Sequence, residues 1–228
     1  MRCIMLSNNN FDKDFARHKL VNIIEPNMKV VCIPFASDLK WLIQNADTEL
    51  NYDGKFTLDQ YKPFREYGIE LGNFYMMKPT DSRKYMKWKI NQADIIYFTG
   101  GKMENIKNTL LKMGLWRYII KHKYNKIFMG VSAGALILQD EYWEVPNVDD
   151  CYKDFRKRNG FGFVENYTVL VHFDKYNENH VLNLITVAKS TGKIVIGMPE
   201  DGGIVVADDV WLSPTGNYQG IIYRLGDV

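Results

Sequence analysis

Cysteine is scarce in this 228-residue sequence. The three cysteines, Cys3, Cys32 and Cys151, are an odd number without the short spacing of a metal site, so we predict neither a disulfide framework nor a zinc centre. Cys3 and Cys32 lie in apolar runs typical of buried strands, and we interpret them as core thiols. This pattern favours a reducing, cytoplasmic location.

Long hydrophobic runs and an excess of charge of one sign are absent as well. No segment approaches the ~18 consecutive apolar residues of a transmembrane helix, and the apolar run in residues 1–8 is too short for a signal peptide. The formal net charge is only +2, from 29 basic and 27 acidic residues spread along the chain. We therefore expect neither a membrane nor a nucleic-acid partner.

The composition is that of a chain with a full hydrophobic core. Hydrophobic residues make up 46% of the sequence and charged residues 25%, as in ordinary globular proteins. No linker-like segment or change of composition divides the chain. The sequence therefore predicts one domain over residues 1–228.

Short apolar runs alternate with amphipathic segments along most of the chain, which predicts a mainly parallel sheet covered by helices on both faces. Strands are predicted at residues 1–7, 29–36, 69–75, 94–98, 167–173, 193–198, 204–206, 210–212 and 221–224, and in the run that ends at Val131. Helices are predicted at residues 38–45, 58–67, 81–92, 103–112, 116–123 and 178–189, and from Ser132 to near Gln139. Residues 140–161 are polar and acidic, and we expect them to be irregular.

The most informative pattern is a serine between two glycines near the middle of the chain. The run Gly130-Val131-Ser132-Ala133-Gly134 follows a short apolar stretch and precedes an apolar helical stretch. This is the pattern of a nucleophile elbow, where a serine on a sharp strand-to-helix turn has strained dihedrals and needs small neighbours. Ser132 is our candidate nucleophile, and the amide of Ala133 would face a forming oxyanion.

A glycine pair, Gly100-Gly101, follows the strand predicted just before the elbow strand. The carboxyl ends of parallel strands form the binding edge of such a sheet, so this turn and Ser132 should lie close together. Bare amides at the glycines would complete the oxyanion hole begun by Ala133. The alternative is a helix-entry turn that needs glycine only for its backbone conformation.

A serine nucleophile needs a base, and the chain has four histidines. His172 alone ends an apolar strand, and it lies downstream of the elbow. Its imidazole should emerge at the same edge of the sheet as Ser132, so we predict it to be the general base. The alternative is a structural histidine.

The carboxylate that would orient the imidazole is left open by the residues themselves. The candidates are Asp174, Asp149, Asp150, Glu141 and Glu200, all in loops or polar segments. Most such carboxylates are merely solvated. We favour Asp174 over Asp150, because it is close to His172 in sequence and needs no long loop to fold back over the sheet.

Four motifs together resemble peptidase family S51, the aspartyl dipeptidase or peptidase E group. They are Phe98-Thr99-Gly100-Gly101, Gly130-Val131-Ser132-Ala133-Gly134-Ala135, Val171-His172-Phe173 and Pro199-Glu200-Asp201-Gly202-Gly203. The resemblance implies the class I glutamine amidotransferase-like fold, a flavodoxin-like three-layer α/β/α sandwich. It also implies a nucleophile at Ser132, a base at His172, an oxyanion hole from Gly101 and Ala133, and no metal or cofactor.

The resemblance offers two positions for the acid. In the dipeptidases it is an aspartate between the serine and the histidine, which points to Asp150. In the amidotransferases it comes two residues after the histidine, which points to Asp174. The chain departs from the dipeptidases at Lys102, where they have asparagine after the glycine pair.

The sequence therefore predicts a cytoplasmic serine hydrolase that cleaves a small peptide or amide through an acyl-enzyme, in particular a peptidase E-like dipeptidase. Its expected partner is that substrate, and a homodimer is left open. One alternative is a non-catalytic binding or regulatory protein with the same fold, to which Lys102 and the ambiguous acid point. Glutamine amide transfer is a weaker alternative, because the known amidotransferases use a thiolate.

Overall fold

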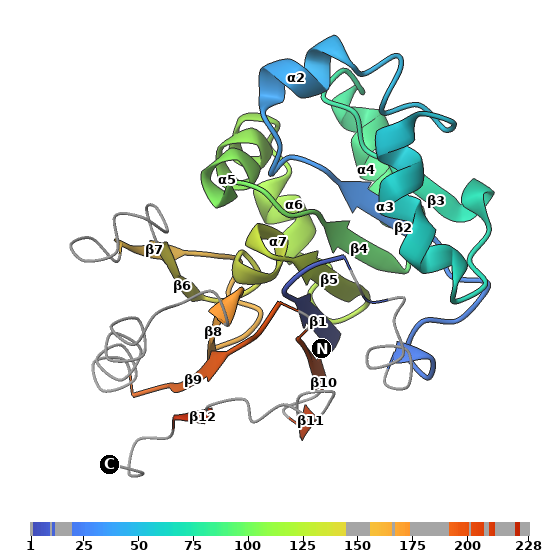
Figure 1. The fold of residues 1–228 in the computed structure, drawn as a ribbon. Coiled ribbons are helices and arrows are strands. Elements are labelled where there is room, and N and C mark those ends of the chain that lie inside the picture. The colour runs from blue at the N-terminus through green and yellow to red at the C-terminus, as the bar shows by residue number, and fades with distance from the viewer. Residues whose placement is uncertain are drawn as a thin grey trace.

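The computed structural model describes residues 2–9, 11, 20–144, 156–165, 167–173, 192–200, 202–207, 210–212 and 222–223. Its main sheet consists of β1 (Arg2–Leu6), β2 (Val30–Ile33), β3 (Phe74–Met76), β4 (Ile95–Phe98), β5 (Ile127–Val131), β10 (Gly203–Ala207) and β11 (Val210–Leu212). The seven strands have the order β11-β10-β1-β5-β4-β2-β3 (Figure 1). The five strands from β1 to β3 in this order are parallel, and β10 and β11 extend the sheet in antiparallel pairing.

Helices cover both faces of this sheet. They are α2 (Leu39–Gln44), α3 (Lys55–Arg65), α4 (Arg83–Gln92), α5 (Met103–Lys112), α6 (Trp116–Ile120) and α7 (Ala133–Leu136), with a 3₁₀ turn, η1, at Leu71–Asn73. Consecutive residues of β4 point to opposite faces: Tyr97 packs on Phe64 of α3, while Phe98 packs on Phe161. Tyr75 of β3 contacts Trp88 of α4. The predicted mainly parallel sheet with helices on both faces is confirmed.

The central strands are apolar at every position because both of their faces are covered. All residues of β2, β4 and β5 are buried. Two of the helices begin with a side-chain cap, in which Asp38 accepts a hydrogen bond from the Trp41 amide and Ser82 accepts one from the Tyr85 amide. Within the described residues, no helix is long and apolar enough to cross a membrane.

The structure corrects the expectation for residues 140–161. This segment contains β6 (Glu141–Glu144) and β7 (Arg156–Asn159), which pair in antiparallel register. The central Tyr and Trp of β6 favour a strand, whereas the Arg, Lys and Asn of β7 do not, and pairing with β6 decides the conformation of β7. The predicted helix at residues 178–189 lies outside the described residues.

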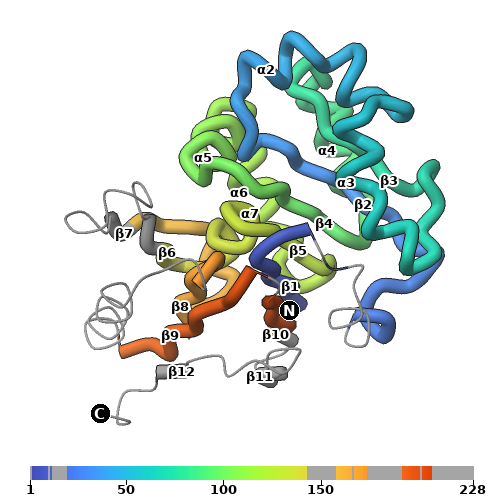
Figure 2. The backbone as a smooth tube through the Cα atoms, viewed as in Figure 1, coloured from blue at the N-terminus to red at the C-terminus, as the bar shows by residue number. Residues whose placement is uncertain are grey.

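Three of the strands that follow the polar segment form a separate sheet. It is formed by β8 (Tyr167–Leu170), β9 (Ile194–Gly197) and β12 (Ile222–Tyr223), with β8 and β9 parallel. The chain after β9 runs back to the end of β1, so residues from distant parts of the sequence lie side by side there (Figure 2).

Two of the three cysteines are core residues, as predicted. Cys3 and Cys32 are fully buried and free. Burial raises the pKa of the Cys3 thiol to about 12, and burial raises the pKa of Cys32 well above its usual value. Neither forms a reactive thiolate near neutral pH. Cys151 lies outside the described residues.

Candidate active site

Ser132 occupies the turn between β5 and α7. Its backbone has φ 51° and ψ −116°, a conformation that residues other than glycine rarely adopt. The Ser132 amide donates a hydrogen bond to the Leu6 carbonyl at the end of β1, at 2.8 Å. The strained turn therefore has the backbone character of a nucleophile elbow.

The two glycines around Ser132 are required by close backbone approach. A Cβ atom at Gly130 would overlap the carbonyl oxygen of Gly134, and a Cβ atom at Gly134 would overlap the carbonyl oxygen of Phe98. Because both positions lack a side chain, helix α7 can pack closely against strand β5 and against strand β4. This is the steric reason for the glycine spacing in the sequence.

The structure brings His172 to Ser132 from a different sheet. His172 follows β8, and its Nε2 atom lies 2.9 Å from the Oγ atom of Ser132. His172 has φ 58°. In the part of the chain that the structure describes, Ser132 and His172 are the residues other than glycine with positive φ. Strained backbone of this kind often occurs at functional sites, where the surrounding structure holds it.

Glu200 lies on the other side of the imidazole. Its Oε2 atom is hydrogen-bonded to Nδ1 of His172, and both side chains are 30% exposed. Glu141, another of the sequence candidates, instead lies 3.7 Å from Nζ of Lys193. Asp174, Asp149 and Asp150 lie outside the described residues. Among the described candidates, Glu200 is therefore the carboxylate at the histidine.

Strand pairing explains why Glu200, although distant from His172 in sequence, lies beside the imidazole. Strands β8 and β9 are parallel and pair Leu170 with Gly197, so residues just beyond these two positions meet. His172 is two residues past Leu170, and Glu200 is three past Gly197. The available signal was that both residues directly follow an apolar strand.

The glycine turn after β4 lies against Ser132. A Cβ atom at Gly100 would lie 3.3 Å from Cβ of Ser132, which places the glycine turn against the serine. Gly101 has φ 138°, and a Cβ atom there would come within 2.5 Å of the Ala36 carbonyl oxygen. Within the described part of the chain, the amides of Gly101 and Ala133 donate no hydrogen bond to protein.

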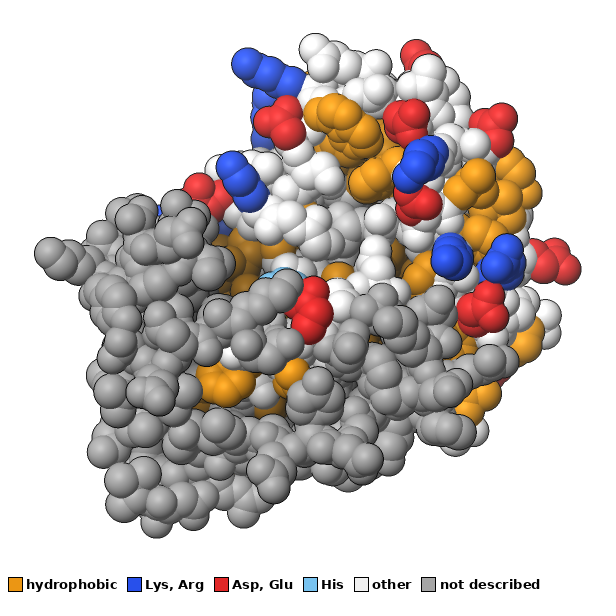
Figure 3. Space-filling view, in the orientation of Figure 1, with side chains coloured by type: hydrophobic (Ala, Val, Ile, Leu, Met, Phe, Trp, Pro, Cys, Tyr) orange, Lys and Arg blue, Asp and Glu red, His pale blue; other side chains and the backbone are white. Residues whose placement is uncertain are grey.

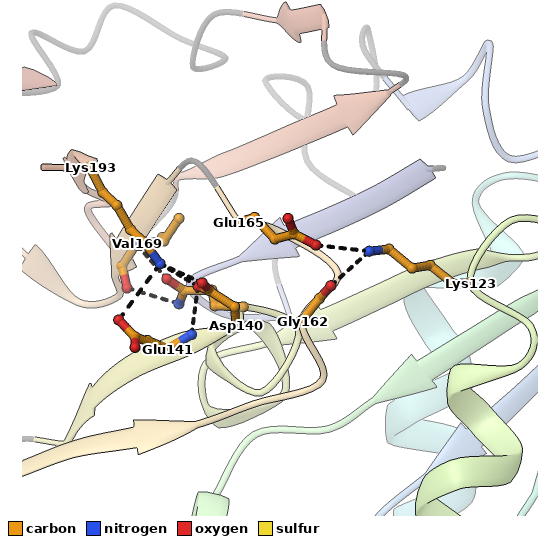
Figure 4. A network of polar contacts seen from close by, with 8 residues as sticks. Lys123, Asp140, Glu141, Gly162, Glu165, Val169 and Lys193 are labelled. Atoms are coloured by element: carbon orange, nitrogen blue, oxygen red, sulfur yellow. Dashed lines mark hydrogen bonds and ion pairs between the residues drawn. The ribbon is translucent and has the colours of Figure 1, made fainter. Parts of the chain in front are cut away.

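Two sets of polar contacts join the elements that carry these residues. Gln139 follows α7, and its side chain is buried. The side-chain oxygen accepts a hydrogen bond from the backbone amide of Val169 at 2.7 Å, and the side-chain nitrogen donates one to the backbone carbonyl of Val169 at 3.2 Å. Lys193, just before β9, contacts both carboxylate oxygens of Asp140, at 2.6 and 2.5 Å (Figure 4). The elbow helix is thus fixed to the strands that precede His172 and Glu200.

In the described residues, no group of three or more metal-binding side chains comes together. On the face in Figure 3, acidic and basic side chains are interspersed with exposed apolar ones. A separate hollow lined by Arg2, Asp94 and Ile127 lies at the opposite, amino-terminal ends of the strands and shares no residue with the site.

Comparison with known proteins identifies the family of this chain. The family model for peptidase family S51 matches residues 4–212. The chain belongs to peptidase family S51. The predicted family is thereby confirmed, and membership supports a peptidase, the coarser part of the predicted activity.

Two solved structures are similar to this S51 chain over nearly its whole length. One is a peptidase from an acI-B1 actinobacterium, with 19% sequence identity and a TM-score of 0.66, covering 99% of this chain and 95% of the other. The second is a protein of Listeria monocytogenes EGD-e that carries the name peptidase E, with 16% identity and a TM-score of 0.60, covering 98% of each chain. At this identity the likeness supports the fold. A search of curated proteins found no match.

Proposed function

We propose that this S51 protein is a serine peptidase that cleaves a small peptide or amide through an acyl-enzyme. The observation that carries the proposal is the chain of two contacts from Ser132 Oγ to His172 Nε2, and from His172 Nδ1 to Glu200. A nucleophile, a base and an orienting acid in that order form a serine-hydrolase triad, whatever the fold that holds them.

The contacts fix the proton on the imidazole. An ionised carboxylate accepts hydrogen bonds only, so Nδ1 of His172 donates to Glu200. The lone pair on Nε2 then faces the Ser132 hydroxyl. The imidazole takes the serine proton as Oγ attacks the carbonyl carbon of the substrate.

The amides of Gly101 and Ala133 would bind the oxygen that becomes negative in this step. When the tetrahedral intermediate collapses, protonated His172 gives its proton to the leaving amine, and the acyl group stays on Ser132. Water, activated by the same imidazole, then releases the acid product and restores the hydroxyl. Besides the substrate and this water, the cycle uses groups of described residues.

The acid in this proposal differs from the two that the sequence favours. Glu200 takes the place given there to Asp174 or Asp150, because Glu200 forms the contact with Nδ1 of His172. Its longer side chain suits a position beyond the end of a neighbouring strand. The proposal therefore rests on Ser132, His172 and Glu200.

Small peptides, and dipeptides in particular, are the substrates we propose. Purified protein should release free amines from unmodified dipeptides, and a panel that varies the first residue should show its preference, with N-terminal aspartate included. Lys102 follows the oxyanion glycines and is exposed, so it is placed to influence that preference.

The panel also separates the proposal from its alternatives. N-acetylated dipeptides and a folded protein substrate serve as controls and should be cleaved poorly. Cleavage of long chains with no turnover of dipeptides would contradict the substrate class. Absence of all hydrolysis would favour a non-catalytic binding protein, and ammonia release from glutamine would favour amide transfer.

A further inference from the structure

We propose that Ser7 is a positioning residue that holds both the base and the acid of the site from the end of β1. This inference rests on the proposed function, because it assigns Ser7 a role toward His172 and Glu200. Ser7 directly follows β1 and is fully buried, with 0% of its surface exposed. It touches no reacting atom, so it acts through the residues that it holds.

The Ser7 hydroxyl joins the two segments that carry the imidazole and its carboxylate. Its Oγ atom accepts a hydrogen bond from the His172 amide at 3.0 Å and donates one to the Met198 carbonyl, also at 3.0 Å. The Ser7 amide donates to the Gly202 carbonyl at 3.0 Å. Ser7 therefore contacts the backbone of His172 and the backbone on both sides of Glu200.

The neighbouring residue completes this arrangement. The Leu6 carbonyl accepts the hydrogen bond from the Ser132 amide, so Leu6 and Ser7 together contact the segments of all three triad members. The Met198 carbonyl also accepts from the Phe173 amide at 3.0 Å. The end of β1 is thus the point where the elbow, the histidine loop and the glutamate loop are joined.

Serine suits this position because its hydroxyl is small and both donates and accepts. The bond to the His172 amide matters most, since His172 has φ 58° and is held in a conformation that it would rarely adopt alone. Without this bond the His172 backbone can relax toward negative φ. Such a change would turn the imidazole away from Ser132 and Glu200.

The test compares Ser7→Ala with a matched control, Thr57→Val. Thr57 is also buried; it lies in the first turn of α3, and its hydroxyl donates to the Glu49 carbonyl at 3.3 Å. Each substitution therefore removes one buried hydroxyl. The first readout is the rate constant for labelling by a serine-directed fluorophosphonate, measured on folded protein well below its thermal transition.

Ser7→Ala should be labelled about 10- to 100-fold more slowly than the wild type, the size of effect that a small displacement of catalytic groups produces. On a dipeptide, kcat should fall by a similar factor with KM nearly unchanged, because Ser7 is not expected to touch substrate. Thr57→Val should stay within about twofold of the wild type, since independent sites act separately. Ser7→Thr keeps the hydroxyl and should restore most of the rate.

The second readout does not depend on activity. The Nδ1 proton of His172 that is hydrogen-bonded to Glu200 gives a far-downfield NMR signal, which should be present in the wild type and Thr57→Val and weakened or lost in Ser7→Ala. Labelling of Ser7→Ala at the wild-type rate, with this signal intact, would overturn the proposal.

The two proposals fail separately. If the wild type itself is not labelled, the proposed function fails, and the NMR signal alone decides the role of Ser7. If Ser7→Ala does not fold, Ser7→Cys replaces it, because a thiol is a weak donor and acceptor. Ser7→Cys should then show slower labelling and a weaker signal, and wild-type values for both would refute the positioning role.

Discussion

Ser132→Ala should lower kcat for peptide hydrolysis by a factor on the order of 10⁴ to 10⁶, with the fold intact. Alanine fits the elbow as well as serine does, but it removes the oxygen that lies 2.9 Å from Nε2 of His172. Circular dichroism and the unfolding temperature should match the wild type. The measurement is kcat on the best dipeptide of the panel.

Ser82→Ala is the control for this variant. Ser82 caps α4, far from the elbow, so its loss should cost about 1 kcal/mol of stability without changing kcat. If Ser132→Ala kept more than about a tenth of the wild-type kcat, the nucleophile would lie elsewhere. The described cysteines are poor replacements, because burial raises the pKa of Cys3 to about 12.

Glu200→Gln should lower kcat by about 10²- to 10⁴-fold. The amide that replaces the carboxylate carries donors as well as an acceptor, so it no longer enforces the tautomer with the proton on Nδ1 of His172. It also removes the negative charge that would stabilise the imidazolium. The measurement is again kcat on the best dipeptide, with fluorophosphonate labelling as a second readout.

Glu141→Gln is the matched control, because Glu141 carries the same side chain and its carboxylate lies 3.7 Å from Nζ of Lys193. It should keep kcat within about twofold, since it does not contact the imidazole. Asp174→Asn and Asp150→Asn test the acids that the sequence favours. A large loss in either of them, together with an active Glu200→Gln, would show that the acid assignment is wrong.

Much of the fold could be predicted because its signals are local. The strands β2, β4 and β5 are buried on both faces, so their sequences are continuous apolar runs bounded by turns. The elbow was predictable for the same reason, because the spacing of Gly130, Ser132 and Gly134 lies within five consecutive residues, although the close contact that requires Gly134 comes from Phe98 of β4. Such patterns require no knowledge of distant segments.

The features that were not predicted depend on contacts between distant segments. The pairing of β6 with β7 makes a strand of the Arg-Lys-Arg-Asn segment, whose local propensity does not indicate one. Glu200 reaches His172 only because β8 and β9 are parallel and in register. Ser7 looks like an ordinary residue at the end of a strand, and its partners come from more than 160 positions away.

The backbone strain at Ser132 and His172 has to be held by the surrounding structure. Ser132 and His172 both have positive φ, which costs of order 1–3 kcal/mol for such residues and persists only where the surroundings enforce it. The end of β1 provides part of that enforcement, through Leu6 for the serine and Ser7 for the histidine. The reacting groups are thus positioned by backbone contacts before a substrate binds.

The most direct test of the proposed acyl-enzyme mechanism is to locate the fluorophosphonate adduct by mass spectrometry after digestion of the labelled protein. We expect one adduct, on the peptide that contains Ser132, at a rate that falls sharply in His172→Ala. Absence of an adduct from folded wild-type protein, or an adduct at another residue with Ser132 unmodified, would contradict the triad of Ser132, His172 and Glu200.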